Sequence, residues 1–215
     1  MKFPLLVFDW DGTLMDSEAR IVGCMQAAIQ DVGLPALETA AIRNIIGLGL
    51  REALEQLFPG CTEPVRQRVV ESYRYHFLGG YHAASPLFPG ALETLTALRE
   101  RGYLLAVATG KGRQGLDSVL RETGCRSLFD ATRCADESFS KPHPQMLLDI
   151  MDELNVPPRA TLMIGDTEYD MRMAANAGAA ALAVSYGVHE RERLLQCGPL
   201  DCLDSISALP VWLDS

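Results

Sequence analysis

Two carboxylates follow the first apolar run of the chain. Residues 4–8 are apolar, and Asp9 and Asp11 come directly after them, one residue apart. A run that is apolar on both faces is typical of a buried strand in a parallel sheet. Alternate side chains of extended backbone share a face, so the two carboxylates can point toward one spot. Carboxylates that close repel each other, and one would keep a proton unless a cation lies between them. A plain turn would also use Asp and Gly, so the rest of the chain must decide between a site and a turn.

Further polar residues follow two later strand candidates, and a lysine lies in a loop between them. The carboxyl ends of parallel strands face the same crevice, so these residues are expected to meet. Each signal alone has an ordinary explanation, such as a helix N-cap for an Asp that precedes a helix. Their coincidence favours one shared site. The residues are Thr109, Gly110 and Lys111 after the run 103–108, Lys141 in a Lys-Pro-His-Pro loop, and Asp166 and Asp170 after the run 160–164.

This set of side chains fits phosphoryl transfer. Four gathered carboxylates require a hard cation, and Mg²⁺ prefers oxygen ligands. A carboxylate that attacks phosphorus forms an aspartyl-phosphate. A second carboxyl group can protonate the leaving oxygen and later activate water. A lysine and a threonine hydroxyl can hold the other phosphoryl oxygens. The sequence therefore predicts a Mg²⁺-dependent enzyme that acts on a small phosphorylated metabolite.

Strands and helices alternate after about residue 86. That rhythm predicts an α/β fold with a doubly wound parallel sheet, because parallel strands need helical crossovers on both faces. The strand candidates are 4–8, 103–108, 160–164 and 179–184, with short ones at 128–132 and near 202–203. The helix candidates are 91–101, 114–122, 144–154, 168–177, 190–196 and a last one from 206.

The segment between the first strand and residue 86 is expected to be purely helical. Asp16 or Ser17 can cap a helix that runs to Val32. Further helices are expected over 39–46, 51–58 and 62–78, where apolar residues recur at helical spacing. We therefore expect a core domain of residues 1–14 and 86–215 and an inserted helical cap domain of residues 15–85. Such an insertion suits a lid over the site.

Composition excludes several classes of function. The net charge is −9 over 215 residues, so attraction of the whole surface to nucleic acid or anionic lipid is not expected. The chain shows no membrane span and no secretion signal. Six dispersed cysteines without a CxxC pair are typical of reduced thiols. We expect a cytoplasmic protein that is a monomer or a homodimer.

The four motifs together resemble those of haloacid dehalogenase-like hydrolases. The matching stretches are Phe-Asp-x-Asp-Gly-Thr-Leu-x-Asp-Ser from Phe8, Thr-Gly-Lys from Thr109, Lys-Pro-x-Pro from Lys141 and Gly-Asp-Thr-x-x-Asp from Gly165. They occur in the order of the family, and the resemblance spans the chain. It implies a Rossmann-type core. The insertion after the first motif is similar to the helical cap of the phosphoglycolate phosphatase-like branch, which implies a phosphatase that hydrolyses a phosphoglycolate-like or sugar-phosphate-like phosphomonoester.

The resemblance implies a role for each matching residue. Asp9 would be the nucleophile, Asp11 the general acid and base, and Lys141 the group that steadies Asp9 and the phosphoryl group. The implied Mg²⁺ ligands are Asp9, Asp11 through its backbone carbonyl, and Asp166, with Asp170 in support. The expected phosphate-binding and substrate-binding residues are Thr109, Gly110, Lys111 and Arg51. The family often has Asn where Gly110 stands, so one side-chain contact to substrate is lost.

The role of Arg51 and the reaction class both have alternatives. Arg51 can meet an acidic group of the substrate from the cap, or it can be a solvated arginine at a turn between helices. Dehalogenases lack the second acid, so Asp11 argues against them. Phosphonate hydrolases use a lysine of the cap. No Lys lies between Lys2 and Lys111, so the sequence does not fit this class. A mutase similar to β-phosphoglucomutase and a non-catalytic module that binds a phosphorylated ligand stay as alternatives.

Overall fold

The computed structural model describes residues 2–80 and 85–215. Its centre is a sheet of six parallel strands in the order β3-β2-β1-β4-β5-β6, which confirms the predicted doubly wound sheet. The chain reverses the direction of strand addition at β1, so a crevice opens at the end of this strand. The strands are β1 (Leu5–Phe8), β2 (Leu104–Thr109), β3 (Ala131–Cys134), β4 (Thr161–Gly165), β5 (Ala180–Val184) and β6 (Cys202–Leu203).

Helices cover both faces of the sheet. Leu6 and Phe8 of β1 face one hydrophobic cluster, and Leu5 and Val7 face the other, as alternation along a strand requires. The first cluster is covered by α5 (Ala91–Glu100), α6 (Arg113–Thr123) and α10 (Leu209–Trp212). The second is covered by α7 (Gln145–Glu153) and α8 (Glu168–Asn176), while α9 (Arg191–Leu195) packs near β5 and β6.

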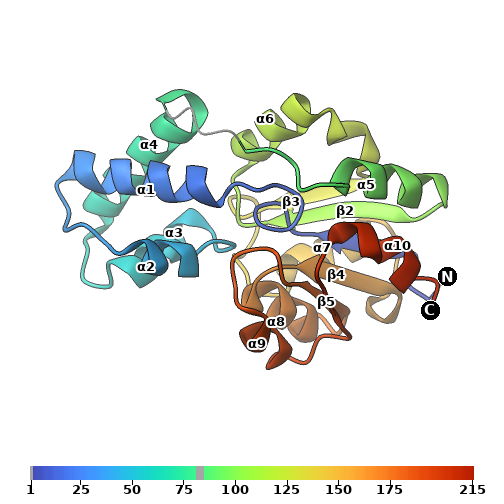
Figure 1. Cartoon of the computed structure of the whole chain (residues 1–215). Helices are drawn as coiled ribbons and strands as arrows, with labels where there is room; N and C mark the ends of the chain where they lie inside the picture. The colour runs from blue at the N-terminus through green and yellow to red at the C-terminus, as the bar shows by residue number, and fades with distance from the viewer. Residues whose placement is uncertain (1, 81–84) are drawn as a thin grey trace.

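Four helices lie beside the sheet, at the end away from the two chain termini (Figure 1). They share a hydrophobic cluster of their own, to which the core adds Val188. The segments that lead into and out of this group run side by side: Met15 bridges Leu87, and Asp16 N donates to Pro86 O at 2.8 Å. The helices are α1 (Glu18–Val32), α2 (Thr39–Asn44), α3 (Leu50–Leu57) and α4 (Glu63–Tyr75), followed by a π-helical turn over His76–Gly80. The division into two domains at the expected boundaries stays a prediction.

Several element boundaries differ from the sequence prediction. The short strand expected at 128–132 is β3, and it begins at Ala131 because Ala131 pairs with Ala106 of β2; a 3-10 turn occupies Cys125–Leu128. Helix α2 ends at Asn44, because the Asn44 carbonyl accepts hydrogen bonds from Tyr169 Oη at 2.8 Å and from the His189 ring at 3.3 Å. The chain then turns, and residues 45–49 reach back toward the sheet. The helix expected over 62–78 becomes α4 plus the π-helical turn.

Candidate active site

Three buried carboxylates meet where β1 and β4 end. Asp9 follows β1 and Asp166 follows β4, while Asp170 lies in the first turn of α8. One oxygen from each lies within 4.8 Å of the others, and all three residues are completely buried. Glycines permit this approach, because a β-carbon on Gly12 would lie 2.2 Å from Asp166 Oδ2 and one on Gly165 would lie 2.4 Å from Asp170 Cβ.

The first turn of α8 holds Asp170 in place. Thr167 caps α8, and its backbone N–H and hydroxyl both donate to Asp170 Oδ2, at 3.1 and 2.6 Å. The N-cap is therefore Thr167, and Asp166 is not used for capping. Asp166 is instead held by Thr13, whose hydroxyl donates to Oδ1 at 2.7 Å, and by the Val188 N–H, which donates to Oδ2 at 2.8 Å.

Lys141 is the buried counter-ion of this group. Its Nζ lies 2.8 Å from Asp9 Oδ1 and 2.6 Å from Asp170 Oδ1, with no exposed side-chain surface. The two carboxylates raise the pKa of Lys141 against the opposing effect of burial, so it stays charged. Three buried carboxylates against one ammonium leave an excess of negative charge, which is costly in a dry interior. Burial accordingly raises the pKa of Asp9 well above its usual range and that of Asp166 to about 7.

The group fits a divalent cation. Asp9 Oδ1 accepts from the Trp10 N–H at 2.7 Å and from Lys141, but Asp9 Oδ2 is buried without a hydrogen-bond partner among the described residues. A buried acceptor without a partner costs free energy, and a bound cation would remove that cost. An all-oxygen donor set suits Mg²⁺. Both oxygens of Asp170 already accept hydrogen bonds, from Lys141 and Thr167, so this residue fits a supporting place.

Asp11 is not one of the three gathered carboxylates, but it lines, together with Asp9, a cavity between the strand ends and the helices α1, α3 and α4. Its Oδ1 accepts from the Ser17 hydroxyl at 2.6 Å, and its Oδ2 lies 3.1 Å from Lys111 Nζ. Ser17, one of the two predicted candidates, is the N-cap residue of α1, but its side chain makes no cap hydrogen bond. The structure thus places Lys111 beside Asp11, and its role in phosphate binding stays a prediction.

Thr109 and Gly110 lie at the end of β2, beside Asp9 and Asp11 in the cavity lining. Thr109 is buried, and its hydroxyl accepts from the Lys111 N–H at 3.2 Å. Residues 45–49 of the helical group cover Gly110. A β-carbon there would lie 2.5 Å from the Gly47 carbonyl oxygen and 2.4 Å from that of Leu48. The family's usual Asn therefore has no room in this arrangement.

Replacing Gly110 with Asn is expected to push the loop 45–49 off the strand end. Backbone oxygens cannot yield as a flexible side chain does, so the overpacking should lower the free energy of unfolding by about 1–3 kcal/mol. Urea unfolding measures the change. Gly60→Asn is the matched control, because nothing lies within 4 Å of a β-carbon at Gly60. Equal stability of the Gly110→Asn variant and the unchanged protein would contradict the close approach.

Arg51 lines the cavity from α3, with an exposed side chain whose Nε lies 3.5 Å from Glu55. This position suits both a contact with substrate and a solvated surface pair, so its role stays a prediction. The loop is fixed on the core by a further contact, since the Gly49 N–H donates to Ser140 Oγ at 2.7 Å.

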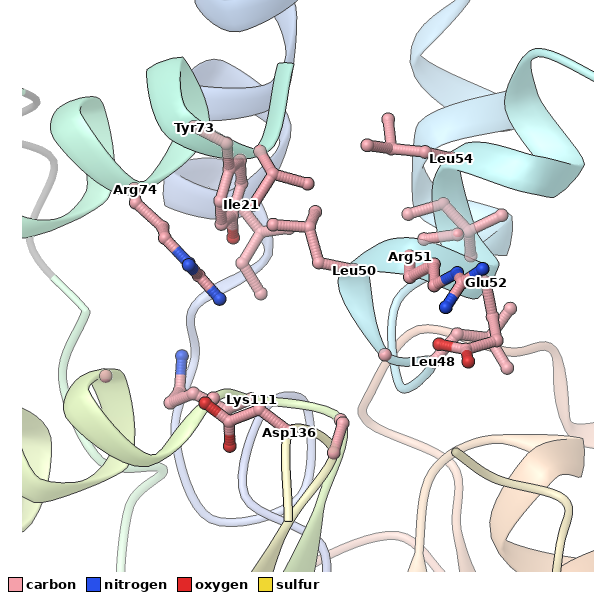
Figure 2. A pocket seen from close by; sticks show the side chains of 18 of the residues that line it. Ile21, Leu48, Leu50, Arg51, Glu52, Leu54, Tyr73, Arg74, Lys111 and Asp136 are labelled. Carbon is pink, nitrogen blue, oxygen red and sulfur yellow. The ribbon is translucent and has the colours of Figure 1, made fainter. Parts of the chain in front are cut away.

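A cavity of about 560 Å³ lies between the strand ends and the helices α1, α3 and α4. Asp9, Asp11 and Thr109 lie among its lining residues on the core side. Figure 2 shows Tyr73 and Arg74 of α4 and Leu50 of α3 pointing into it opposite Lys111.

Four of the residues around the site were missed in the sequence analysis. Thr13 had a readable signal, because it stands two residues after Asp11 in the first motif. The Val188 amide had none, since a backbone donor carries no sequence signature. Tyr73 and Arg74 look like ordinary residues of an amphipathic helix, and only the fold shows which of them face the cavity.

Comparison with known proteins agrees with this geometry. The sequence model described as haloacid dehalogenase-like hydrolase matches residues 6–184. The "Probable phosphatase IndB" of Dickeya dadantii is 37% identical over 208 residues, covering 95% of this chain and 90% of that protein. A phosphoglycolate phosphatase of Vibrio vulnificus is 31% identical and covers 97% and 95% of the two chains. The crystal structure of a predicted phosphoglycolate phosphatase from Haemophilus somnus superposes with a TM-score of 0.86 at 26% identity, covering 99% of both chains.

Proposed function

The chain belongs to the haloacid dehalogenase-like hydrolases, and we propose that it hydrolyses small phosphomonoesters with Mg²⁺ through an aspartyl-phosphate on Asp9. Relatives named as phosphatases support the reaction class. The observation that carries the proposal is the set of three buried carboxylates around Lys141, with the unpartnered Asp9 Oδ2 among them and the cavity beside Asp9.

Each step can be assigned to a residue of this chain. A carboxylate oxygen of Asp9 forms a bond to phosphorus while the bond to the leaving oxygen breaks, and Asp11 donates a proton to that oxygen. Thr109 and the Gly110 N–H would hold the phosphoryl oxygens, since both residues line the cavity beside Asp9. Water then attacks phosphorus, Asp11 takes up its proton, and the bond from Asp9 to phosphorus breaks. Lys141 keeps Asp9 oriented and charge-balanced throughout.

Asp9, Asp166 and the Asp11 backbone carbonyl would hold Mg²⁺, with Asp170 supporting them. The bound cation would neutralise charge on the carboxylates and on the phosphoryl group, so that two anions can approach each other. Helices α1 to α4 would act as a cap that excludes water from this step. All six cysteines are free thiols, which supports the expected cytoplasmic setting. Among the helices of residues 2–80 and 85–215, none has the length and apolar character needed to cross a membrane.

Phosphate release from an aryl phosphate tests the proposal. The purified protein is expected to release phosphate in the presence of Mg²⁺ and to stop when EDTA removes the metal. Formation of a sugar-phosphate isomer without free phosphate would identify a mutase instead. Binding of phosphoesters without any turnover across a broad panel would identify a non-catalytic module. Either result would overturn the proposed hydrolysis.

The affinity for Mg²⁺ is expected to fall below about pH 7. Burial, together with the charge of Asp170, raises the pKa of Asp166 to about 7. A proton and Mg²⁺ compete for this carboxylate, so each pH unit below that value should weaken the affinity about tenfold through Asp166 alone. Calorimetric titrations at pH values on both sides of 7 measure this. An affinity that stays constant between about pH 5.5 and 7.5 would contradict the assignment of Asp166 as a ligand.

A further inference from the structure

The cavity is too large for a two-carbon phosphoester. If each of the about nine non-hydrogen atoms of phosphoglycolate took the ~30 Å³ of a liquid water, the molecule would fill only about half of the volume. The cavity measures about 560 Å³. The remaining space lies between α1, α3 and α4, away from the carboxylates. This space belongs to the leaving group of the substrate, because the phosphoryl group must lie beside Asp9.

Apolar side chains of α1 and α3 form one part of the walls around this space, beside polar residues such as Glu52 and Gln67. Ile21 and Met25 of α1 and Leu54 of α3 line the cavity and are almost completely buried, and Leu50 points into it (Figure 2). Tyr73 stacks on Phe77, with ring centroids 5.7 Å apart, and adds an aromatic surface. Along the apolar part of the walls, a hydroxylated sugar would lose water without recovering its hydrogen bonds. An apolar or ring-bearing leaving group gains from the same burial.

One cation in the lining has no partner among residues 2–80 and 85–215. Arg51, Arg66 and Lys111 pair with Glu55, Glu63 and Asp11, respectively. Arg74 is exposed, lines the cavity and makes no ion pair or side-chain hydrogen bond within that part of the chain. Figure 2 shows its guanidinium group pointing across the cavity toward the amine of Lys111. Because Lys111 is already paired with Asp11, Arg74 is the positive charge that can attract an anion into this space.

We propose that the preferred substrate is a phosphomonoester whose leaving group has an apolar, ring-sized body against Ile21, Leu50 and Tyr73 and an anionic end at Arg74. This inference rests on the proposed phosphatase function and narrows its substrate class. Arg74 contributes an uncommitted charge, and its hydrogen bonds to a carboxylate would be charge-assisted. Leu50 contributes apolar contact only. Arg74 should therefore affect recognition of the anionic end of the substrate, and Leu50 recognition of its apolar body.

Three phosphoesters separate these contributions: phenyl phosphate, 4-carboxyphenyl phosphate and phosphoglycolate. The unchanged protein is expected to show the highest kcat/KM with 4-carboxyphenyl phosphate, about tenfold above phenyl phosphate, in line with one charge-assisted hydrogen bond. Arg74→Gln should remove that tenfold advantage and change kcat/KM for phenyl phosphate less than about twofold. Leu50→Ala should lower kcat/KM for both aryl esters at least about tenfold, the scale of a lost methylene contact in an apolar pocket, and leave phosphoglycolate unchanged.

Matched control variants come from the same helices. Arg68 lies on α4 with an exposed side chain, and it does not line the cavity. Leu57 lies on α3, half-buried and likewise outside the cavity lining. Arg68→Gln and Leu57→Ala should keep the substrate order of the unchanged protein. Calorimetric binding of 4-carboxyphenyl phosphate to the Asp9→Asn variant gives a readout without turnover, and adding Arg74→Gln should weaken it about tenfold.

The outcomes separate this inference from the proposed function. A preference for phosphoglycolate, or an equal loss for all three esters in Arg74→Gln, would overturn the inference and leave the phosphatase function standing. Lack of turnover of every ester in the presence of Mg²⁺ would overturn the proposed function, and the inference with it. A selective loss with the carboxylated ester in Arg74→Gln supports both.

Discussion

Replacing Asp9 with Asn is expected to lower phosphoester hydrolysis by at least about 10⁴-fold, the scale on which removal of a covalent nucleophile acts. The side chain keeps its shape, and its Oδ1 can still accept from the Trp10 N–H and from Lys141. What disappears is the anionic oxygen that attacks phosphorus. A folded protein with an intact cavity and almost no turnover is therefore the expected result.

The same change should stabilise the metal-free protein. Burial raises the pKa of Asp9 far above its value in the unfolded chain. The folded state therefore favours the protonated form, and the stability linked to that proton is lost as the pH rises through the raised pKa. Asn carries no titrating proton and escapes this loss. The difference in Tm between the variant and the unchanged protein, both in EDTA, should increase with pH.

Two measurements check the role of Asp9. Acid quenching during turnover of a ³²P-labelled ester should leave a hydroxylamine-labile label on the peptide that contains Asp9, and the Asp9→Asn variant should carry none. Asp152→Asn is the control, because Asp152 lies exposed on α7, outside the cavity lining. Turnover by Asp9→Asn within about tenfold of the unchanged protein would remove the nucleophile from the mechanism.

The sheet and the motifs at its strand ends could be predicted because both depend on local sequence. Residues 5–8 and 162–164 are apolar on both faces, which is the signature of central parallel strands. Once such strands are parallel, their carboxyl ends must meet. The meeting of Asp9, Asp166 and Asp170 therefore follows from the order of elements alone. The structure brings these three residues together with Lys141, as the sequence predicts.

The remaining features depend on contacts between distant segments, which single-sequence patterns do not encode. Ser17 has the residue type of an N-cap, but Asp11 takes its hydroxyl. The apolar pattern continues past Asn44, yet α2 ends there because Tyr169 and His189 bind its carbonyl. Gly110 looks like a lost substrate contact in the sequence. In the fold it is the position over which the loop 45–49 packs.

Replacing Lys141 with Met should have the largest effect on stability. The substitution fills a similar volume but leaves Asp9 and Asp170 buried without their counter-ion. Removing one partner of a buried ion pair typically costs 3–5 kcal/mol, and here about that much should be lost from the free energy of unfolding at neutral pH. For a chain of this size, the Tm should fall by roughly 10 °C. Hydrolysis should also fall steeply, because Asp9 loses the group that orients it.

The pH dependence distinguishes this charge effect from simple loss of packing. Asp9 and Asp170 raise the folded-state pKa of Lys141 above its unfolded value, so its contribution is fully present at neutral pH and is lost only in strong alkali. In the Met variant, the loss in the free energy of unfolding comes from the charged carboxylates that have no counter-ion. It should shrink as the pH falls below about 7, where Asp166 takes up a proton.

Urea unfolding at about pH 5.5 and pH 8 measures both effects. Lys2→Met is the control, because Lys2 is exposed far from the carboxylates. Adding Asp170→Asn to Lys141→Met should recover part of the stability, since it removes one of the uncompensated charges. A loss that is equal at both pH values and unchanged by Asp170→Asn would point to packing alone. In that case the buried ammonium would not be the group that balances the carboxylates, and the charge argument for a divalent cation beside Asp9 would lose its physical basis.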